Sequence, residues 1–119
     1  AQTMDCGACE VITNVKIGEF TYQITEVEKP GQPDETRELH AYVLYGQCAI
    51  QVKQDLNPNM KAVALLHEIL HAIIRQTGLE FEGDDYTEEK FVIAISHGLL
   101  ALLRHNPELV EYVTEQVQA

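Results

Sequence analysis

The segment from Asn57 to Gly78 constrains the fold more than any other part of the chain. Asn57 followed by Pro58 is a helix start, because asparagine caps free N–H groups and proline is favoured at the first helical position. Gly78 suits the left-handed residue that ends many helices, so we predict a helix from Pro58 to about Gln76. Apolar residues surround this helix almost completely, which predicts a central element buried by other parts of the fold.

Two histidines and a glutamate lie in this apolar helix. His67 and His71 are four residues apart, so their imidazoles stand on one face about one turn from each other and can bind a single ion. Glu68 points round the helix, where it can accept a proton from a water that a metal activates. Unpaired polar groups in a buried helix are costly, and a metal removes that cost. We therefore predict zinc (Zn2+) bound by His67 and His71 with Glu68 as general base, rather than two core histidines satisfied by hydrogen bonds.

A third metal ligand must come from another element, because a catalytic zinc usually has three protein ligands. The extended motif HExxHxxGxxH is absent, since Ile74 and Thr77 occupy its glycine and last histidine positions. The candidates lie on the next predicted helix and are Glu88, Glu89, His97 and His105.

We prefer Glu89 as the third ligand. It begins a line of residues that we expect to pack against the first helix, namely Val92, Ile95, Ser96 and Leu99. Glu88 lies about 100° from that line, so we expect it to point towards solvent and to interact only with the helix dipole. His97 is a weaker candidate than either glutamate.

The first half of the chain alternates β-branched or aromatic residues with polar ones, which is typical of half-buried strands. The predicted strand segments are 15–27, as a strand pair or one long bent strand, then 39–44 and 48–52, with Gly46 in a turn. Two prolines and a glycine in segment 29–35 predict an exposed loop. We expect an α+β fold in which a small sheet of three or four mainly antiparallel strands packs on the metal-binding helix.

Two further helices are predicted after the metal-binding helix, one long and one short. Asp85 or Thr87 can cap the long helix, which continues to about His105. Asn106-Pro107 then repeats the combination of a cap and a proline, and opens a short helix that ends near Val117.

Length and charge restrict the class of protein. The 119 residues suit one domain, which we assign to residues 1–119 with residues 1–14 as a loosely ordered arm. The formal net charge of -11 repels phosphate backbones, so we expect no nucleic-acid partner. No apolar run reaches the roughly 20 residues that span a bilayer, and no basic and apolar export signal is recognisable, so we expect no membrane association.

Three cysteines are an odd and small set, which argues against a secreted disulfide framework and for a reducing, cytoplasmic location. Cys6 and Cys9 have the CxxC spacing of half a zinc knuckle, but a second CxxC pair is missing. We expect these two residues and Cys48 to be packing cysteines rather than a second metal site or a redox site.

Together these motifs resemble the small phage and prophage zincins, which are similar to minimal gluzincins and to ImmA/IrrE-type metallopeptidases. The resemblance covers roughly residues 15–113 and rests on the Tyr45-Gly46-Gln47 turn and Ile50, the LLHEILHAI segment, Glu88-Glu89, Gly98-Leu99-Leu100 and Asn106-Pro107. It implies a twisted sheet packed on the metal-binding helix, zinc bound by two histidines and a downstream glutamate, and the glutamate of HExxH as base. We expect no partner domain of the kind that larger members carry.

Three functions are compatible with such a site. We favour a zinc-dependent endopeptidase that acts on a peptide or protein substrate, with Glu68 passing a proton to the leaving amine. The second function is a catalytically weak, zinc-stabilised regulatory or protein-binding module. The third is a hydrolase of non-peptide bonds that uses the same residues.

Some of the remaining histidines and tyrosines are candidates for a catalytic role, and others have a simpler structural explanation. Tyr45, Tyr86 and His97 are candidates for stabilising a developing oxyanion, although aromatic residues at such spacings lie more often in a core. We expect His40 to face solvent and His105 to interact with the carboxyl end of its helix.

Overall fold

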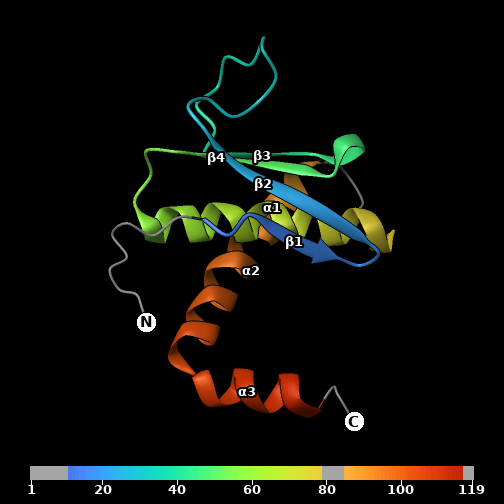
Figure 1. The fold of residues 1–119 in the computed structure, drawn as a ribbon, viewed down its shortest axis with the longest axis vertical. Coiled ribbons are helices and arrows are strands. Elements are labelled where there is room, and N and C mark those ends of the chain that lie inside the picture. Colours follow the sequence, from blue (N-terminus) through green and yellow to red (C-terminus); the bar gives the residue numbers. More distant parts are fainter. Residues whose placement is uncertain (1–10, 79–84, 117–119) are drawn as a thin grey trace.

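A computed structural model describes residues 11–78 and 85–116 of the 119-residue chain. Within these residues the order of elements is four strands followed by three α-helices, as the sequence predicted. The strands are β1 (Asn14–Ile17), β2 (Phe20–Val27), β3 (Ala41–Leu44) and β4 (Ala49–Lys53), with the 3-10 turn η2 (Tyr45–Gln47) between the last two. The helices are α1 (Pro58–Thr77), α2 (Asp85–His105) and α3 (Pro107–Gln116). The sheet and α1 form two layers, from which α2 leads away to α3 (Figure 1).

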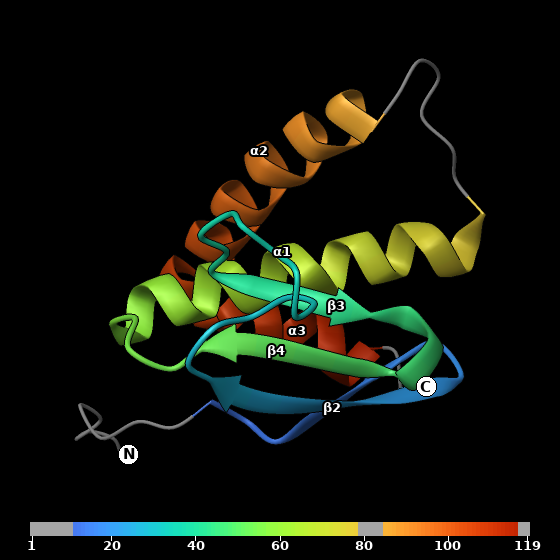
Figure 2. The ribbon, with the colours of Figure 1, turned by 90° about the horizontal axis from the view of Figure 1, so that it is seen from above.

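The sheet is mixed and has the strand order β1-β2-β4-β3. β1 pairs with β2, and β3 with β4, in antiparallel register, whereas the central strands β2 and β4 run parallel with Ile24 opposite Ile50. The prediction of an antiparallel sheet is therefore wrong for its central pair. After β2 the chain crosses to the far edge of the sheet before β3 begins, so the β3–β4 hairpin returns β4 beside β2 (Figure 2). Alternation of side chains is the same in parallel and antiparallel strands, which is why the sequence pattern did not distinguish them.

The segment predicted as either a strand pair or one bent strand is a strand pair, β1 and β2. Ile17 is opposite Phe20 across a two-residue turn. The turn begins with Gly18 at φ 61°, a backbone conformation that glycine adopts without strain.

The residues just before β1 are attached to the sheet. The Ile24 N–H donates to the carbonyl oxygen of Thr13 at 2.9 Å, and the Val11 N–H donates to a carboxylate oxygen of Glu26 at 3.3 Å. The predicted loose arm is therefore wrong for residues 11–14, while its residues 1–10 lie outside the described part of the chain.

The loop between β2 and β3 is mostly exposed, as predicted, but one of its prolines is not. Pro30 is fully buried, and the neighbouring Gly31 N–H donates to the side-chain oxygen of Gln51 on β4 at 2.9 Å. This contact fixes the start of the loop to the sheet. His40, near the other end of the loop, is exposed as expected, and β3 begins at Ala41 rather than at the predicted Leu39.

The core lies between one face of the sheet and α1. Its buried residues are Ile17, Tyr22, Ile24, Ala41, Ile50, Val52, Ala64 and Ala72. Ile50 and Val52 of the central strand β4 are completely buried, and each such side chain contributes about 1.5–3 kcal/mol relative to exposure. The two alanines of α1 are small, so this helix can approach the sheet closely.

The predicted limits of α1 are confirmed to within one residue. The side-chain oxygen of Asn57 accepts a hydrogen bond from the Met60 N–H at 2.8 Å, which is the capping contact that the sequence predicted. The helix ends at Thr77, followed by Gly78 at φ 77° in the left-handed region. α1 is a central helix, because the sheet contacts it on one side and α2 on another.

α2 packs on α1 through Val92 and Ser96, which are completely buried. The predicted packing line is only partly right, because Ile95 is 39% exposed and turns away from α1. α2 begins at Asp85, so both predicted cap residues, Asp85 and Thr87, lie inside the helix rather than before it.

The far part of α2 and α3 extend away from the sheet and α1 (Figure 1). α3 begins at Pro107 as predicted and packs on α2. Several large apolar side chains on this part of the chain are exposed, namely Leu102, Leu103, Leu109, Tyr112 and Val113.

Two further expectations concern membranes and cysteines. Within the described residues, no helix has both the length and the apolar character needed to cross a membrane. Cys48 is a free, half-buried thiol at φ 51°, and it contacts the core as a packing cysteine does. Cys6 and Cys9 lie outside the described residues, so their predicted role stays a prediction.

Candidate metal centre

The two histidines of the HExxH motif occupy successive turns of α1 on the side that faces α2. Their ring centroids are 4.9 Å apart, and the side chains of His67 and His71 are 18% and 15% exposed. The four-residue spacing in a regular helix produces this arrangement directly. Both rings therefore reach the same small volume beside the helix, as the sequence predicted.

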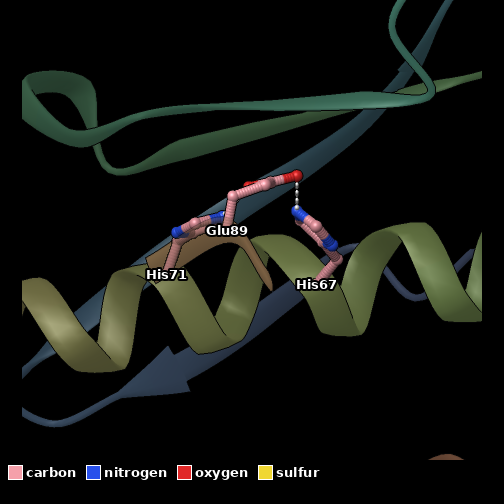
Figure 3. A group of neighbouring side chains, drawn as sticks. All are labelled: His67, His71 and Glu89. Atoms are coloured by element: carbon pink, nitrogen blue, oxygen red, sulfur yellow. Dashed lines mark hydrogen bonds and ion pairs between the residues drawn. The ribbon is translucent and has the colours of Figure 1, made fainter. Parts of the chain in front are cut away.

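The first turn of α2 brings a carboxylate to each histidine. Glu89 bridges the two rings, with Oε2 3.2 Å from Nε2 of His67 and Oε1 2.9 Å from Nε2 of His71. Figure 3 shows Glu89 reaching over α1 between the two imidazoles. One ligand atom each from His67, His71 and Glu89 lies within 4.8 Å of the others, so the three residues predicted as ligands form a group that fits one metal ion.

The prediction that Glu88 points to solvent is wrong. Its Oε2 lies 2.6 Å from Nδ1 of His71, and its side chain is 27% exposed, compared with 47% for Glu89. The reason is helical phase, because Glu88, Val92 and Ser96 are spaced four residues apart and form the line that faces α1. The predicted packing line included Ile95, which is exposed. For this reason the predicted packing face of α2 did not include Glu88.

The contacts of His71 restrict its protonation. Carboxylate oxygens approach both of its ring nitrogens, at 2.6 Å and 2.9 Å. A neutral imidazole has one N–H and one lone pair, so it can donate to only one of them. Either the ring is a cation that donates to both carboxylates, or Nδ1 donates to Glu88 while a metal occupies the space between Nε2 and Glu89.

The two histidines respond differently to this environment. Burial lowers the pKa of His67, and this effect outweighs the nearby carboxylate of Glu89, which raises it. Burial also lowers the pKa of His71, but hydrogen bonds to Glu88 and Glu89 outweigh burial and raise it overall. His67 therefore tends to be neutral, which is the form that binds a metal.

Glu68, the predicted base, lies outside the group of three but beside it. Burial raises the pKa of its carboxyl to about 7, with His71 lowering it and Glu89 raising it to smaller extents. A carboxyl with this pKa exchanges its proton near neutral pH, as a general base requires.

Two adjoining clefts open along the side of α1 that carries these residues. The larger cleft has a volume of about 940 Å³ and the smaller one about 530 Å³. His67, Glu68 and Glu89 line both of them, together with Leu39 and Ala41 from the end of the loop and the start of β3. The candidate metal centre therefore lies at the junction of one long groove between α1, α2 and the β3 edge.

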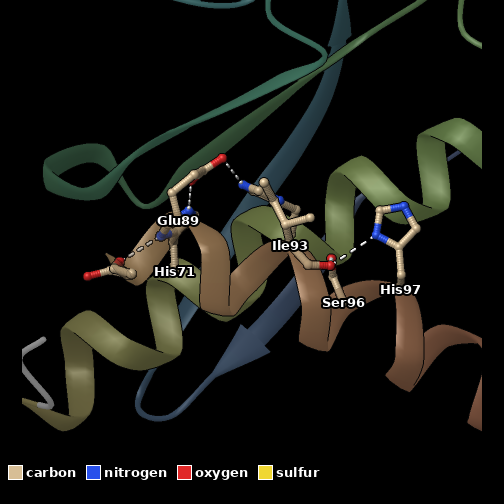
Figure 4. A network of polar contacts seen from close by, with 7 residues as sticks. His71, Glu89, Ile93, Ser96 and His97 are labelled. Atoms are coloured by element: carbon tan, nitrogen blue, oxygen red, sulfur yellow. Dashed lines mark hydrogen bonds and ion pairs between the residues drawn. The ribbon is translucent and has the colours of Figure 1, made fainter. Parts of the chain in front are cut away.

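The other candidate ligands do not join the group. His97 is exposed, and its Nδ1 lies 3.0 Å from the Ile93 carbonyl oxygen on its own helix, although it lines the smaller cleft. Figure 4 shows His97 about two turns along α2 from Glu89 and beside Ser96. His105 is exposed at the end of α2, where we expected it to interact with the helix dipole.

The oxyanion candidates are only partly described. Tyr45 lines the larger cleft, and burial together with the carboxylates of Glu68 and Glu88 raises its pKa to about 12. Its hydroxyl therefore remains a hydrogen-bond donor at neutral pH. The side chain of Tyr86 lies outside the described part of the chain.

Two arginines that were not predicted as site residues, Arg37 and Arg75, also line the larger cleft. Arg75 follows His71 by one turn of α1, a spacing from which its position could have been predicted. Arg37 comes from the loop before β3, where no sequence signal indicates which side chain turns towards the cleft.

Comparisons with known proteins do not identify the chain. No protein-family model matches it, and searches of curated proteins and of solved structures found no significant match. Any assignment of function therefore rests on the residues and their geometry.

Proposed function

We propose that the protein binds one zinc ion through His67, His71 and Glu89 and hydrolyses peptide bonds with Glu68 as general base. The observation that carries this proposal is the pair of carboxylates at His71. Carboxylate oxygens of Glu88 and Glu89 lie at its two ring nitrogens. With a metal in the space that Glu89 and His67 share, Nδ1 of His71 would donate to Glu88 and Nε2 would bind the metal, which is how metal-binding histidines are commonly arranged.

The donor set suits zinc in particular. Two imidazole nitrogens and one carboxylate oxygen are ligands that zinc accepts, and three protein ligands leave a fourth position open for chemistry. When bound, zinc lowers the pKa of a water and polarises a carbonyl group.

The role of Glu68 follows from its position and its environment. Its carboxyl lines both clefts beside the three proposed ligands but contributes no atom to their group. A pKa of about 7 allows it to take a proton from the attacking water and to return that proton to the leaving amine.

A peptide is the substrate class that the groove fits best. β3 is an edge strand of the sheet, it pairs with β4 on one side, and its residues line the groove. An edge strand can add an extended peptide by main-chain hydrogen bonds, which would lay the peptide across the zinc ligands. This arrangement supports the resemblance to minimal gluzincins and to small phage and prophage zincins. The proposed location is the cytoplasm, which the small and odd number of cysteines favours.

A two-part measurement on matched variants tests the proposal. Metal analysis of the wild type and of Glu68→Gln should find about one zinc per chain in both, because Glu68 is not a ligand. Hydrolysis of a denatured protein or a fluorogenic peptide mixture should fall by about 100-fold or more in Glu68→Gln. Absence of zinc after refolding with added metal would contradict the zinc site, and equal rates would contradict the role of Glu68.

The exposed apolar residues of α2 and α3 favour a second candidate, a zinc-stabilised protein-binding module. Leu102, Leu103, Leu109, Tyr112 and Val113 are exposed on these two helices, and apolar side chains gathered at a surface often mark a site of protein–protein contact. Such a module would bind zinc as tightly as the proposed peptidase, but neither the wild type nor Glu68→Gln would hydrolyse peptides.

A further inference from the structure

Arg75 is a cation held within the larger cleft beside the candidate metal centre. It lies one helical turn beyond His71 on α1, and its guanidinium carbon is 4.3 Å from the ring centroid of Tyr45. Both side chains line the larger cleft together with His67, His71 and Glu89. Stacking on an aromatic face fixes the plane of a guanidinium while leaving its N–H edge free to donate.

The charges of the cleft leave Arg75 without a carboxylate partner in the described part of the chain. The other cleft arginine, Arg37, is neutralised by Glu35 through contacts of 2.8 Å and 3.1 Å. Among the side chains that the structure describes, no ion pair includes Arg75, whereas Glu88 and Glu89 pair with the two histidines. Among the described residues, Arg75 is therefore available to an anion that enters the cleft.

The two ends of the groove differ in chemistry. The end away from Arg75 is lined by the apolar side chains of Met60, Val63 and Ile93, and the end at Arg75 carries the arginine and the tyrosine. A substrate that lies along the groove thus meets a cationic group on one side of the candidate metal centre and an apolar surface on the other.

We propose that Arg75, stacked on Tyr45, forms a subsite for an acidic side chain of the peptide that occupies the groove. This inference rests on the proposed function and names its substrate class. The four residues from His71 to Arg75 advance about 6 Å along α1, and an extended peptide advances about 3.3 Å per residue, so the acidic residue lies about two residues from the scissile bond.

The direction of the peptide follows from the strand that it would join. β3 and α1 run the same way along the groove, because Ala41 and Val63 line the smaller cleft while Tyr45 and Arg75 line only the larger one. A peptide that pairs antiparallel to β3 therefore has its amino-terminal side at Arg75. The acidic residue precedes the scissile bond.

The proposed subsite selects acidic residues by direct contact and not by long-range attraction. The formal net charge of -11 repels acidic peptides over long range, and this repulsion is screened at physiological ionic strength. A planar guanidinium forms two parallel hydrogen bonds with a carboxylate, which selects Glu or Asp over Gln or Asn once the peptide is in the groove.

Probes that bind zinc through a hydroxamate fix the position of each peptide residue in the groove and allow a binding measurement that does not depend on turnover. Acetyl-Glu-Ala-hydroxamate and acetyl-Gln-Ala-hydroxamate both bind the metal, and their residues occupy the amino-terminal side of the scissile bond. Calorimetry with zinc-loaded wild type should give about 10-fold tighter binding of the Glu probe. Arg75→Gln should abolish this preference, Arg75→Glu should reverse it, and Arg75→Lys should retain part of it.

The control variant is Lys16→Gln, which removes one positive charge at an exposed position of β1 and should keep the full preference. Zinc affinity and melting temperature of each Arg75 variant show whether the site and the fold survive. Succinyl hydroxamates coupled to Glu or Gln extend on the opposite side and should show no preference.

The possible failures are distinguishable. Equal binding of the Glu and Gln probes by zinc-loaded wild type, or an unchanged preference in Arg75→Gln, would overturn this inference and leave the proposed function intact. A preference only among the succinyl probes would overturn the assigned direction. If neither probe binds protein that carries one zinc, the proposed function fails and this inference fails with it.

Discussion

Oε2 of Glu88 lies 2.6 Å from Nδ1 of His71, closer than either contact that Glu89 makes with the two histidines. When a metal takes the space between Nε2 and Glu89, a carboxylate at Nδ1 would hold the proton on that nitrogen and direct the lone pair of Nε2 at the metal. Glu88 is thereby a positioning residue for His71, a role that the sequence analysis had not assigned to it.

The first prediction concerns this positioning. Glu88→Ala should weaken zinc binding by about 10- to 100-fold, because His71 loses the acceptor that orients its ring. Competition with a chromophoric chelator measures the affinity. Glu111→Ala removes the same charge from an exposed position on α3 and serves as the control. Equal affinities of these two variants would show that Glu88 contributes only its charge.

The second prediction ranks the two neighbouring glutamates. Glu89→Ala should weaken zinc binding by more than Glu88→Ala does, by about 1,000-fold or more, since it removes one of three ligands rather than a partner of a ligand. The same titration, run side by side on both variants, measures the difference. A reversed order would assign the ligand role to Glu88.

The third prediction concerns stability. Zinc should bind the native state and not the unfolded chain, so removing it should lower the melting temperature. At a free zinc concentration about 1,000 times the dissociation constant the stabilisation is about 4 kcal/mol, which corresponds to a shift of about 15 °C for a domain of this size. Calorimetry with and without EDTA measures the shift, and His67→Ala should show none. An unchanged midpoint after the metal is removed would contradict a stabilising role.

The fourth prediction concerns pH in the metal-free protein. The pKa of Glu68 is raised from 4.5 to about 7, so the native state holds a proton that the unfolded chain releases. The resulting stabilisation is complete below about pH 4.5 and is lost as the pH rises through about 7.

Comparison with Glu68→Gln isolates this contribution from those of the histidines. Urea unfolding at about pH 5 and about pH 8 should show that the wild type loses more stability than the variant over this interval. A stability difference between the two proteins that does not change with pH would contradict the raised pKa.

Local sequence determined the parts of this protein that depend on neighbouring residues. Asn57, Pro58 and Gly78 set the limits of α1, because capping and left-handed geometry act over a few residues. The spacing of His67 and His71 placed both rings on one face before any tertiary contact was known. The α+β order of elements likewise follows from hydrophobic periodicity.

Tertiary structure decided the relations between elements. The parallel pairing of β2 with β4 depends on where the loop after β2 crosses the sheet, and alternation alone carries no information about strand direction. The direction of Glu88 depends on the phase at which α2 packs on α1, and a shift of one residue turns a side chain by about 100°. Arg37 lines the cleft because of the path that its loop takes before β3, which no local pattern encodes. Periodicity and capping are properties of one segment, whereas strand direction, helix phase and loop path are chosen by the contacts that bury the most apolar surface between segments.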